Sequence, residues 1–419
     1  MSTSELVIDG MNCFAGRLTV SEALAWVDGV EALGDTETIG LPQALGRVLA
    51  RAVAASADLP DFARAAMDGY ALRARDVEGA GAYAPLPLKV VGDSRPGRAS
   101  GVSVGLGEAV RILTGAPMPD GADAVLPIEQ VQPRGDNIEA LAPVAEGMHV
   151  SPRGEDLAAG ELGLQAGRRL RPQDVGLLSA LGSPAVEVRR RPRVRLLITG
   201  GEVVPPDGER TEGRIHDANG PMLSALIARD GGELESLQRL GDERAALVAA
   251  LSEPGADLLL VSGGSSVGDE DYGPDVLREL GELAIRGVAM RPGSPVGMGR
   301  IGACPVFLLS GNPVACLLQY DLFAGRALRR LGGLAPGWPY ACRRLRLSRK
   351  VSSAPGRLDI CRVRVDGGQA VPITASGASL LTTVTRADGF LLVPDALEGY
   401  AEGTEVDVFL YDPCAEEPL

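Results

Sequence analysis

The segment SGGSSVGDEDY, residues 262–272, places glycines and serines directly before a cluster of carboxylates. Consecutive backbone N–H groups of Gly263, Gly264 and Ser265 are suited to bind an anion, because a glycine turn exposes them without steric conflict. Asp271 closes the acidic cluster, and carboxylate oxygens suit Mg²⁺ that shares its coordination sphere with substrate phosphates. The segment therefore predicts a site for a phosphate group and its divalent metal.

Other glycine-bearing loops offer groups for the same site. ITGGEVV (198–204) places Glu202 after a glycine pair, and Asp242 follows RLG. MRPGSP (290–295) offers Arg291, whose guanidinium can bind an oxyanion through two parallel donors. A simpler interpretation stays open, because glycine turns are common and acids near helix starts often serve only as caps.

LSGNP (309–313) is a further loop of this kind. Its residues are Ser310, Gly311, Asn312 and Pro313. Proline suits the first turn of a helix, where its missing N–H would have no partner in any case. The loop could bind an anion or could only join a strand to a helix. Several such loops in one region favour a binding site.

The segment 192–330 must position these loops. Its short apolar runs VRLLIT, DLLLVS, IRGVAM and PVFLLS alternate with amphipathic patterns such as DERAALVAALSE and GPDVLRELG. This alternation predicts a doubly wound α/β domain, with a parallel sheet covered by helices on both faces. Loops at the carboxyl ends of parallel strands meet at one edge, where ligands bind.

The segments on either side of residues 192–330 have different hydrophobic patterns. TVSEALAWV, LPQALGRVLARAV and RPQDVGLLSALG are predicted helices, the first with Thr19 and Glu22 at capping-box spacing. From residue 56 to 145, short β-prone pieces between Gly and Pro turns predict a small β domain. Residues 340–412 alternate again and predict an all-β module.

The composition and charge of the chain argue against several classes of protein. The chain has 419 residues, and its net charge of −14 argues against non-specific binding of nucleic acid or membrane. No apolar run reaches the roughly 18 residues that span a bilayer, and the acidic N-terminus is unlike a signal peptide. The six cysteines form no CxxC pair and only two histidines are present, which argues against a zinc site. We expect a cytoplasmic protein with reduced thiols.

Eight motifs in a fixed order carry a family resemblance. They are AAMDGYALR (65–73), RILTGAPMPDGADAVLPIE (111–129), RGEDL (153–157), TGGEV (199–203), SGGSSVGDEDY, RPGSP, LSGNP and PGRLD (355–359). Over about residues 17–412 the chain resembles the MoeA-like molybdopterin molybdenumtransferases, the family that includes the E domain of gephyrin.

The resemblance implies a fold and a reaction. Its four domains would be residues 1–55 with 146–185 (extended and N-terminal), 56–145 (the inserted β domain), 186–332 (α/β, similar to molybdopterin adenylyltransferase) and 333–419 (a small β barrel). The implied molecule is an elongated homodimer with its active site between subunits. The implied reaction takes adenylylated molybdopterin and molybdate, with Mg²⁺, and gives molybdenum cofactor and AMP. Molybdopterin adenylyltransferase and molybdoenzymes are the implied partners.

The resemblance also assigns roles by motif position. The implied catalytic set is Glu202, Asp242, Asp271 and Arg291, of which the three acids belong to the metal and pyrophosphate end. The phosphate would be held by Gly263, Gly264 and Ser265, while Arg291 and residues 310–313 would lie near the molybdate and the dithiolene. Asp68 and Thr114 would reach the other subunit's pocket, and Arg357 and Ser379 would touch the pterin. Turn geometry before Gly69 accounts for Asp68 equally well.

The chain departs from the family pattern at several positions. In PDFARAAMDGY the acid and the serine of the family motif fall on Ala63 and Ala65. The lysine that some members carry before MRPG falls on Gly287, and the PGKP lysine falls on Ser294. Arg291 replaces another lysine and keeps its charge but not its shape.

These departures leave alternative functions open. One is a non-catalytic carrier that binds molybdopterin or the finished cofactor and delivers it to a partner enzyme. AMP release separates the two, because a carrier binds without cleaving. A nucleotide pyrophosphatase is a third hypothesis, and equal cleavage of ADP-ribose would favour it.

Overall fold

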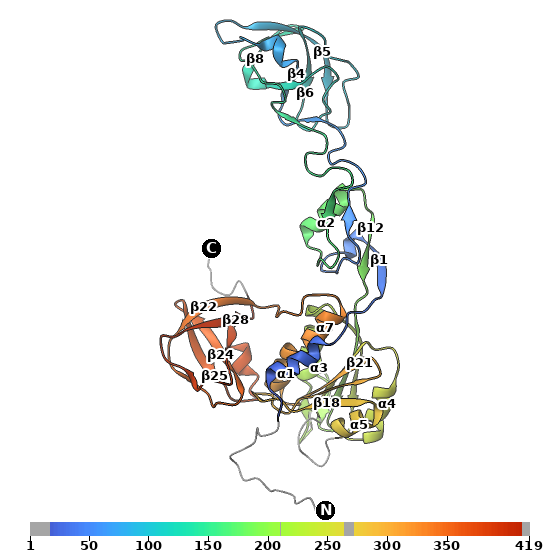
Figure 1. The fold of residues 1–419 in the computed structure, drawn as a ribbon, viewed down its shortest axis with the longest axis vertical. Coiled ribbons are helices and arrows are strands. Elements are labelled where there is room, and N and C mark those ends of the chain that lie inside the picture. The colour runs from blue at the N-terminus through green and yellow to red at the C-terminus, as the bar shows by residue number, and fades with distance from the viewer. Residues whose placement is uncertain (1–16, 210, 264–271, 413–419) are drawn as a thin grey trace, which may run out of the picture. The chain divides into compact units, whose positions relative to one another are not determined.

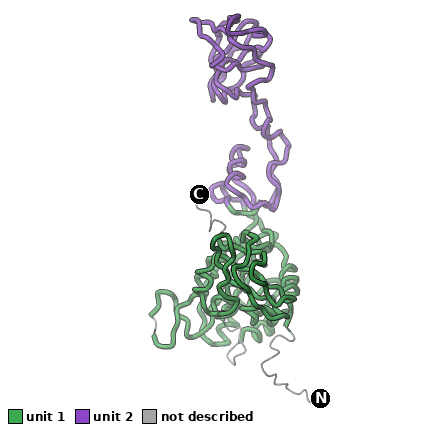
Figure 2. The backbone as a smooth tube through the Cα atoms, turned by 90° about the vertical axis from the view of Figure 1, so that its left-hand side faces the viewer, with its two compact units in different colours: residues 1–37, 46–48, 189–419 green, residues 38–45, 49–188 purple. Residues whose placement is uncertain are grey.

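The structure, a computed structural model, describes residues 17–209, 211–263 and 272–412 (Figure 1). The chain divides into two compact units (Figure 2). Unit 1 comprises residues 1–37, 46–48 and 189–419, and unit 2 comprises residues 38–45 and 49–188. Strands β1 (Thr36–Gly40) and β12 (Ala185–Arg189) extend across the borders between them.

A mixed sheet in unit 1 carries the candidate loops. Its order among the described residues is β16 (Glu233–Leu240), β13 (Arg193–Thr199), β17 (Leu258–Ser262), β21 (Cys304–Leu309), β20 (Gly297–Ile301) and β18 (Glu282–Arg286). The neighbouring strands from β16 to β21 pair in parallel, whereas β20 pairs antiparallel with both β21 and β18. β17 is buried along its whole length, as expected for a central strand covered on both faces.

The IRGVAM segment does not form the single parallel strand that its apolar run predicts. Ile285 and Arg286 end the antiparallel strand β18. β19 (Met290–Arg291) then pairs with β24 (Leu358–Asp366) of the C-terminal module. Gly287 separates the two strands with a φ of 82°, a backbone conformation that glycine adopts without strain. The apolar run therefore serves two different sheets.

Helices cover both faces of the sheet, which confirms the predicted doubly wound architecture. One face carries α1 (Val20–Asp28), α3 (Asn219–Arg229), α6 (Pro313–Gln319), the π-helical turn η4 (Tyr320–Ala324) and α7 (Gly325–Leu331), and the other carries α4 (Arg244–Ser252) and α5 (Gly273–Leu280) (Figure 1). Successive residues of β13 point to opposite faces of the sheet, so Leu196 packs in the core on the α3 face and Leu197 in the core on the α4 face. The predicted capping box at Thr19 and Glu22 is present at the start of α1.

The C-terminal module is a closed β barrel. Its strands are β22 (Ala341–Leu347), β24, β25 (Gln369–Thr374), β26 (Gly389–Val393) and β28 (Glu405–Leu410), accompanied by β23 (Val351–Ser352), β27 (Gly399–Tyr400) and the short helix α8 (Thr382–Thr385). The ring runs β24–β25–β22–β28–β26 and returns to β24. Closure pairs the strand edges that would otherwise be exposed.

Unit 2 contains the predicted small β domain. Its sheet has the order β7 (Ala124–Pro127), β4 (Gly69–Leu72), β6 (Glu108–Ile112), β5 (Leu86–Ser94), β9 (Asn137–Ala140) and β8 (Val131–Arg134). The rest of the unit comprises β2 (Val53–Ala54) paired with β11 (Leu162–Leu164), β3 (Arg64–Ala65) paired with β10 (Val150–Ser151), and helix α2 (Pro172–Ala180). Short 3₁₀ turns are η1 (Leu41–Gln43), η2 (Ala74–Val77) and η3 (Ile128–Gln130).

The prediction of a helix for LPQALGRVLARAV is wrong, since the helical structure there is limited to the 3₁₀ turn η1 and strand β2 begins at Val53. Gly46 has a φ of 75°, which interrupts any helix. Beyond it, the Leu49 N–H donates to the Arg168 carbonyl at 2.9 Å and the Ala50 N–H to the Glu187 carbonyl at 3.0 Å. Pairing with distant segments satisfies these backbone groups and overrides the helical pattern of the side chains.

Candidate functional site

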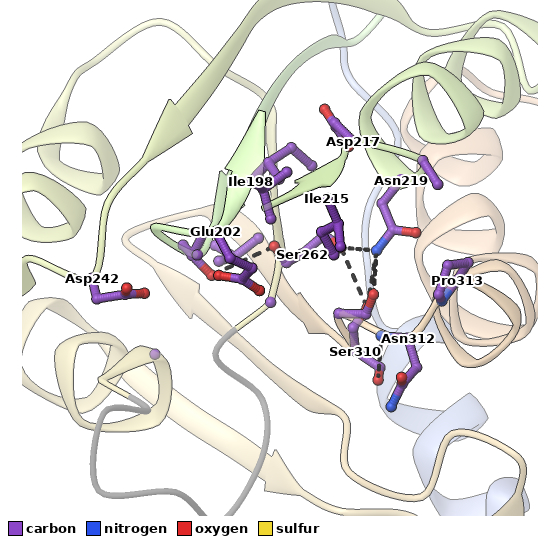
Figure 3. A pocket seen from close by; sticks show the side chains of 18 of the residues that line it. Ile198, Glu202, Ile215, Asp217, Asn219, Asp242, Ser262, Ser310, Asn312 and Pro313 are labelled. Carbon is purple, nitrogen blue, oxygen red and sulfur yellow. Dashed lines mark hydrogen bonds between the residues drawn. The ribbon is translucent and has the colours of Figure 1, made fainter. Parts of the chain in front are cut away.

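A cleft of about 720 Å³ opens at the carboxyl ends of the parallel strands in unit 1 (Figure 3). The loops that line it follow β13, β16, β17 and β21, as expected for an α/β sheet. Of the residues predicted from the sequence, the cleft brings together Glu202, Asp242, Gly263, Ser310, Gly311, Asn312, Pro313 and Ser379.

Exposed carboxylates line the cleft, and they include Glu202, Asp242 and Glu243. Figure 3 shows the two that were predicted from the sequence, Glu202 and Asp242. Asp242 follows β16, and its Oδ2 accepts the Gly201 N–H at 3.0 Å. Glu202 follows β13 and precedes the short parallel pair β14 (Val203–Val204) and β15 (Ile215–His216). Because both side chains are exposed and line the same cleft, they are available to a cation.

Two glycines allow the chain to turn tightly at this edge. Gly263 has a φ of 104°, and a Cβ atom there would lie 2.5 Å from both the carbonyl oxygen and the hydroxyl of Thr199. Gly200 has a φ of 130°, and a Cβ atom would lie 2.6 Å from Oε2 of Glu202. At Gly263 an added Cβ atom would meet backbone, whereas at Gly200 it would meet only the end of the Glu202 side chain and the positive φ is what favours glycine.

Buried hydroxyl and amide groups form the opposite side of the cleft. Asn219, at the start of α3, donates from Nδ2 to the Ser262 hydroxyl at 2.9 Å and to the Gly311 carbonyl at 2.9 Å (Figure 3). Ser262 and Ser310 are 1% and 5% exposed, so these groups are fixed within the protein. Asn219 thus joins the ends of β17 and β21, which sequence reasoning missed. The only signal was a polar HDAN segment whose last residue begins the helix.

The barrel reaches the rim of the cleft at its 375–379 loop. The Ala378 carbonyl accepts from the N–H groups of Val314 and Ala315, at 2.9 and 3.2 Å. These N–H groups belong to the first turn of α6, where no intrahelical acceptor exists. Ser379 lines the cleft as a consequence.

Arg291 and Arg357 meet at a buried carboxylate instead of lining the cleft. Arg291 Nη2 bonds to Asp359, and Arg357 Nε donates to Asp359 at 2.9 Å. Asp359 is fully buried, and it also accepts the Ser353 hydroxyl at 2.8 Å. Neither arginine is among the described residues that line the cleft. The structure therefore brings these two predicted residues together, with Arg291 on β19 and Arg357 directly before the barrel strand β24.

Asp68 and Thr114 also come together, within unit 2. Asp68 Oδ1 accepts the Thr114 backbone N–H at 2.7 Å and the Thr114 hydroxyl at 2.6 Å. These hydrogen bonds, from the hydroxyl first and the N–H second, hold the pKa of Asp68 below its ordinary value. Both residues are exposed, so the paired carboxylate stays accessible.

A guanidinium lies beside both positions where the family lysines are missing. Arg17 Nη1 bonds to the Ser294 hydroxyl, which itself donates to the Val288 carbonyl at 2.7 Å. A Cβ atom on Gly287 would lie 3.5 Å from Cγ, Cδ and Nε of the same arginine. This distance is an ordinary van der Waals contact, so Gly287 lies directly beside the Arg17 side chain.

Three predicted residues, Gly264, Ser265 and Asp271, lie outside the described residues. Within the described part of the chain, no group of three or more His, Cys, Asp or Glu side chains could hold a metal. The pair Glu202 and Asp242 still fits Mg²⁺, because this ion is often bound by one or two carboxylates together with substrate phosphates.

Comparisons with known proteins cover nearly the whole chain. Family models match the MoeA N-terminal region (domain I and II) over residues 18–182, the "Probable molybdopterin binding domain" over 195–330, and the MoeA C-terminal region (domain IV) over 344–411. Across the helices that the structure describes, none is long and apolar enough to cross a membrane.

Curated relatives and a solved structure agree with these matches. Molybdopterin molybdenumtransferase 2 of Mycobacterium tuberculosis is 34% identical over 386 residues, covering 89% of this chain and 94% of the relative. Molybdopterin molybdenumtransferase of Staphylococcus aureus is 29% identical over 409 residues, covering 96% and 98%. The molybdopterin biosynthesis MoeA protein of Pyrococcus horikoshii superposes with a TM-score of 0.82 at 34% identity, covering 94% of this chain and 100% of that one.

Proposed function

Because the chain belongs to the MoeA family, we propose that it is a molybdopterin molybdenumtransferase that inserts molybdate into adenylylated molybdopterin and releases AMP with the help of Mg²⁺. The observation that carries the proposal is the arrangement of one cleft. Carboxylates line one side, and the hydroxyl and amide groups of the LSGNP loop line the other. These two sides suit the two ends of a substrate that carries a pyrophosphate at one end and a metal-binding dithiolene at the other.

Glu202 and Asp242 are the residues proposed to hold Mg²⁺ at the pyrophosphate, with Asp271 as a third carboxylate. The ion would neutralise negative charge on the phosphoryl oxygens as the P–O–P bond breaks and AMP leaves. The glycine turn at Gly263 and Gly264, with Ser265, is proposed to bind the phosphate through backbone and hydroxyl donors. Asp242 keeps one carboxylate oxygen for this role, because its hydrogen bond to Gly201 uses only Oδ2.

The oxyanion and the pterin are assigned to the other side. Ser310, Gly311, Asn312 and Pro313, with Arg291, are proposed to lie near the molybdate, and Arg357 and Ser379 near the pterin. Support comes from Ser379, which the barrel loop brings to the same cleft as Ser310. Asp68 and Thr114 are proposed to complete the site of a second copy in a cytoplasmic homodimer, and their accessible, fixed carboxylate is consistent with that role.

AMP release tests the proposal directly. Purified protein is mixed with adenylylated molybdopterin and Mg²⁺, with and without molybdate, and the nucleotide is followed by chromatography. We expect molybdate-stimulated release that stops when Mg²⁺ is chelated. Tight binding of the substrate with no AMP would contradict an enzyme and indicate a carrier, whereas equal cleavage of ADP-ribose would indicate a general pyrophosphatase.

A further inference from the structure

Gln319 is a fully buried amide directly behind the cleft. It is the last residue of α6, at the point where the helix widens into the π-helical turn η4. Such turns interrupt the regular helical register and are frequent near functional sites. A buried amide must also find partners for its own polar atoms, so its contacts identify what it holds.

The side chain of Gln319 joins two loops of the cleft. Its Oε1 accepts the Ser310 N–H at 2.7 Å. Its Nε2 donates to the Gly293 carbonyl at 2.7 Å and to the Pro295 carbonyl at 2.9 Å. Both amide hydrogens and the amide oxygen are therefore used. Ser310 and Pro295 each line the cleft, so Gln319 ties together two parts of its wall.

The two loops that contact Gln319 are also fixed by other features of the structure. Gly293 has a φ of 99°, and a Cβ atom there would lie 3.1 Å from Cγ and 3.4 Å from Nε2 of Gln319. Asn219 holds the Ser310 loop from another direction through the Gly311 carbonyl. The 291–295 loop is held in turn by the bond from Arg17 to Ser294. Gln319 is the side chain that connects these two anchored loops to each other.

We propose that Gln319 is a positioning residue. It fixes the distance between the two parts of the cleft wall that contain Pro295 and Ser310, and this distance sets the affinity for the tetrahedral oxyanion. The statement about oxyanion affinity rests on the proposed function, whereas the statement that Gln319 holds the two loops does not. An amide can accept from one backbone N–H and donate to two carbonyls at once. A carboxylate would face both carbonyls with oxygen, and an alkyl chain would leave three buried backbone groups without this partner.

Two substitutions of similar size test the role. Gln319→Met keeps most of the volume and removes the hydrogen bonds, while Gln319→Glu keeps the acceptor and removes the donors. For both we expect the KM for molybdate to rise about tenfold or more, because small misplacements of binding groups have effects of this order. The dissociation constant for adenylylated molybdopterin, measured without molybdate, should change less than the KM for molybdate, because the pyrophosphate end of this substrate is untouched.

Leu251→Ala is the matched control. Leu251 is 2% exposed in the core on the other face of the sheet and is not among the residues that line the cleft. Its truncation should lower stability without the selective rise in the KM for molybdate. Equal changes in Leu251→Ala and Gln319→Met would overturn the proposal, since they would show that any loss of core stability has the same effect.

Hydrogen exchange provides a readout that does not need activity. In full-length protein, the peptide that contains the Ser310 amide should exchange on the order of tenfold faster in Gln319→Met than in the wild type, because the Ser310 N–H loses its acceptor. A peptide from β24 should be unchanged. If the wild type releases no AMP, the proposed function fails while this experiment still decides whether Gln319 holds the loops. Unchanged exchange, or faster exchange with an unchanged KM for molybdate, overturns the positioning role.

Discussion

Among the exposed carboxylates that line the cleft, Glu202 and Asp242 are the two assigned to the metal, and each can be tested alone. Asp242→Asn and Glu202→Gln should lower Mg²⁺-dependent AMP release by about 100-fold, the order seen when one charge-stabilising group is removed. The melting temperature should stay within about 1 °C of the wild type, since surface substitutions rarely alter stability. The measurements are AMP release across a Mg²⁺ titration and thermal unfolding.

Glu212→Gln is the control for this pair. It removes one exposed carboxylate of the same region that does not line the cleft. It should leave the Mg²⁺ dependence of AMP release unchanged. If Asp242→Asn behaves like Glu212→Gln, the assignment of Asp242 to the metal is wrong.

At the residue scale, the sequence predicts the groups that sit on strand-end loops. Glu202 and Ser310 follow apolar strands and Asp242 follows the polar strand β16, and the geometry of a parallel sheet brings residues at strand ends to one edge. Asn219 and Gln319 could not be found in the same way. Each is a single amide in a helical segment, and its role depends on which loops the fold places against it.

At the scale of the element, the turn after β17 depends on one glycine. Gly263→Ala would force an L-residue to a φ of 104° and place its Cβ atom 2.5 Å from Thr199. We expect the free energy of unfolding to fall by at least about 1–2 kcal/mol, the cost of a left-handed conformation alone. AMP release should fall as well, because the proposed phosphate-binding loop begins at this residue. Urea unfolding followed by tryptophan fluorescence measures the first effect.

Gly241→Ala is the matched control for this turn. Gly241 lines the same cleft, but its φ is not positive and a Cβ atom there would meet nothing within 4 Å. The same chemical change should therefore leave stability nearly unaffected. Equal losses from Gly263→Ala and Gly241→Ala would mean that the backbone conformation of Gly263 is not what requires glycine.

Strand β16 could not be predicted from an apolar run. It is an edge strand with the sequence ELESLQRL, and all of its residues are exposed or half-buried. It therefore lacks the apolar run that marks β17 in the same sheet. IRGVAM shows the opposite case, since one apolar run is shared by two sheets and only the turn at Gly287 marks the division.

At the scale of the whole molecule, the two units differ in the groups that titrate in alkaline solution. Residues 38–188 contain no cysteine, and Trp26 and Trp338 both belong to unit 1. Burial raises the pKa of Cys304 and Cys316 to about 12 and that of Cys361 to about 11. The three thiols lie in or against different cores of unit 1, so their ionisation opposes its folding at several places.

The sign of the pH dependence follows from these shifts. The ordinary thiol pKa is 9.0, so below pH 9 the thiols are neutral in both the folded and the unfolded chain, and their stabilising contribution is complete. As the pH rises from 9 towards 11–12, the unfolded chain ionises first and the contribution is lost. We expect the urea midpoint of unit 1, followed by tryptophan fluorescence, to fall progressively between pH 9 and pH 11.

Half-buried tyrosines of the same unit act in the same direction, so the thiols need a separate test. Burial raises the pKa of Tyr340 and Tyr411 as well. A variant with Cys304→Ala, Cys316→Ala and Cys361→Ala should be less stable than the wild type at pH 8, because buried volume is lost. Its stability should nevertheless fall less steeply between pH 9 and pH 11, because fewer groups ionise on unfolding. Parallel pH profiles for the variant and the wild type would assign the alkaline loss to the tyrosines, and the thiols would then have no part in it.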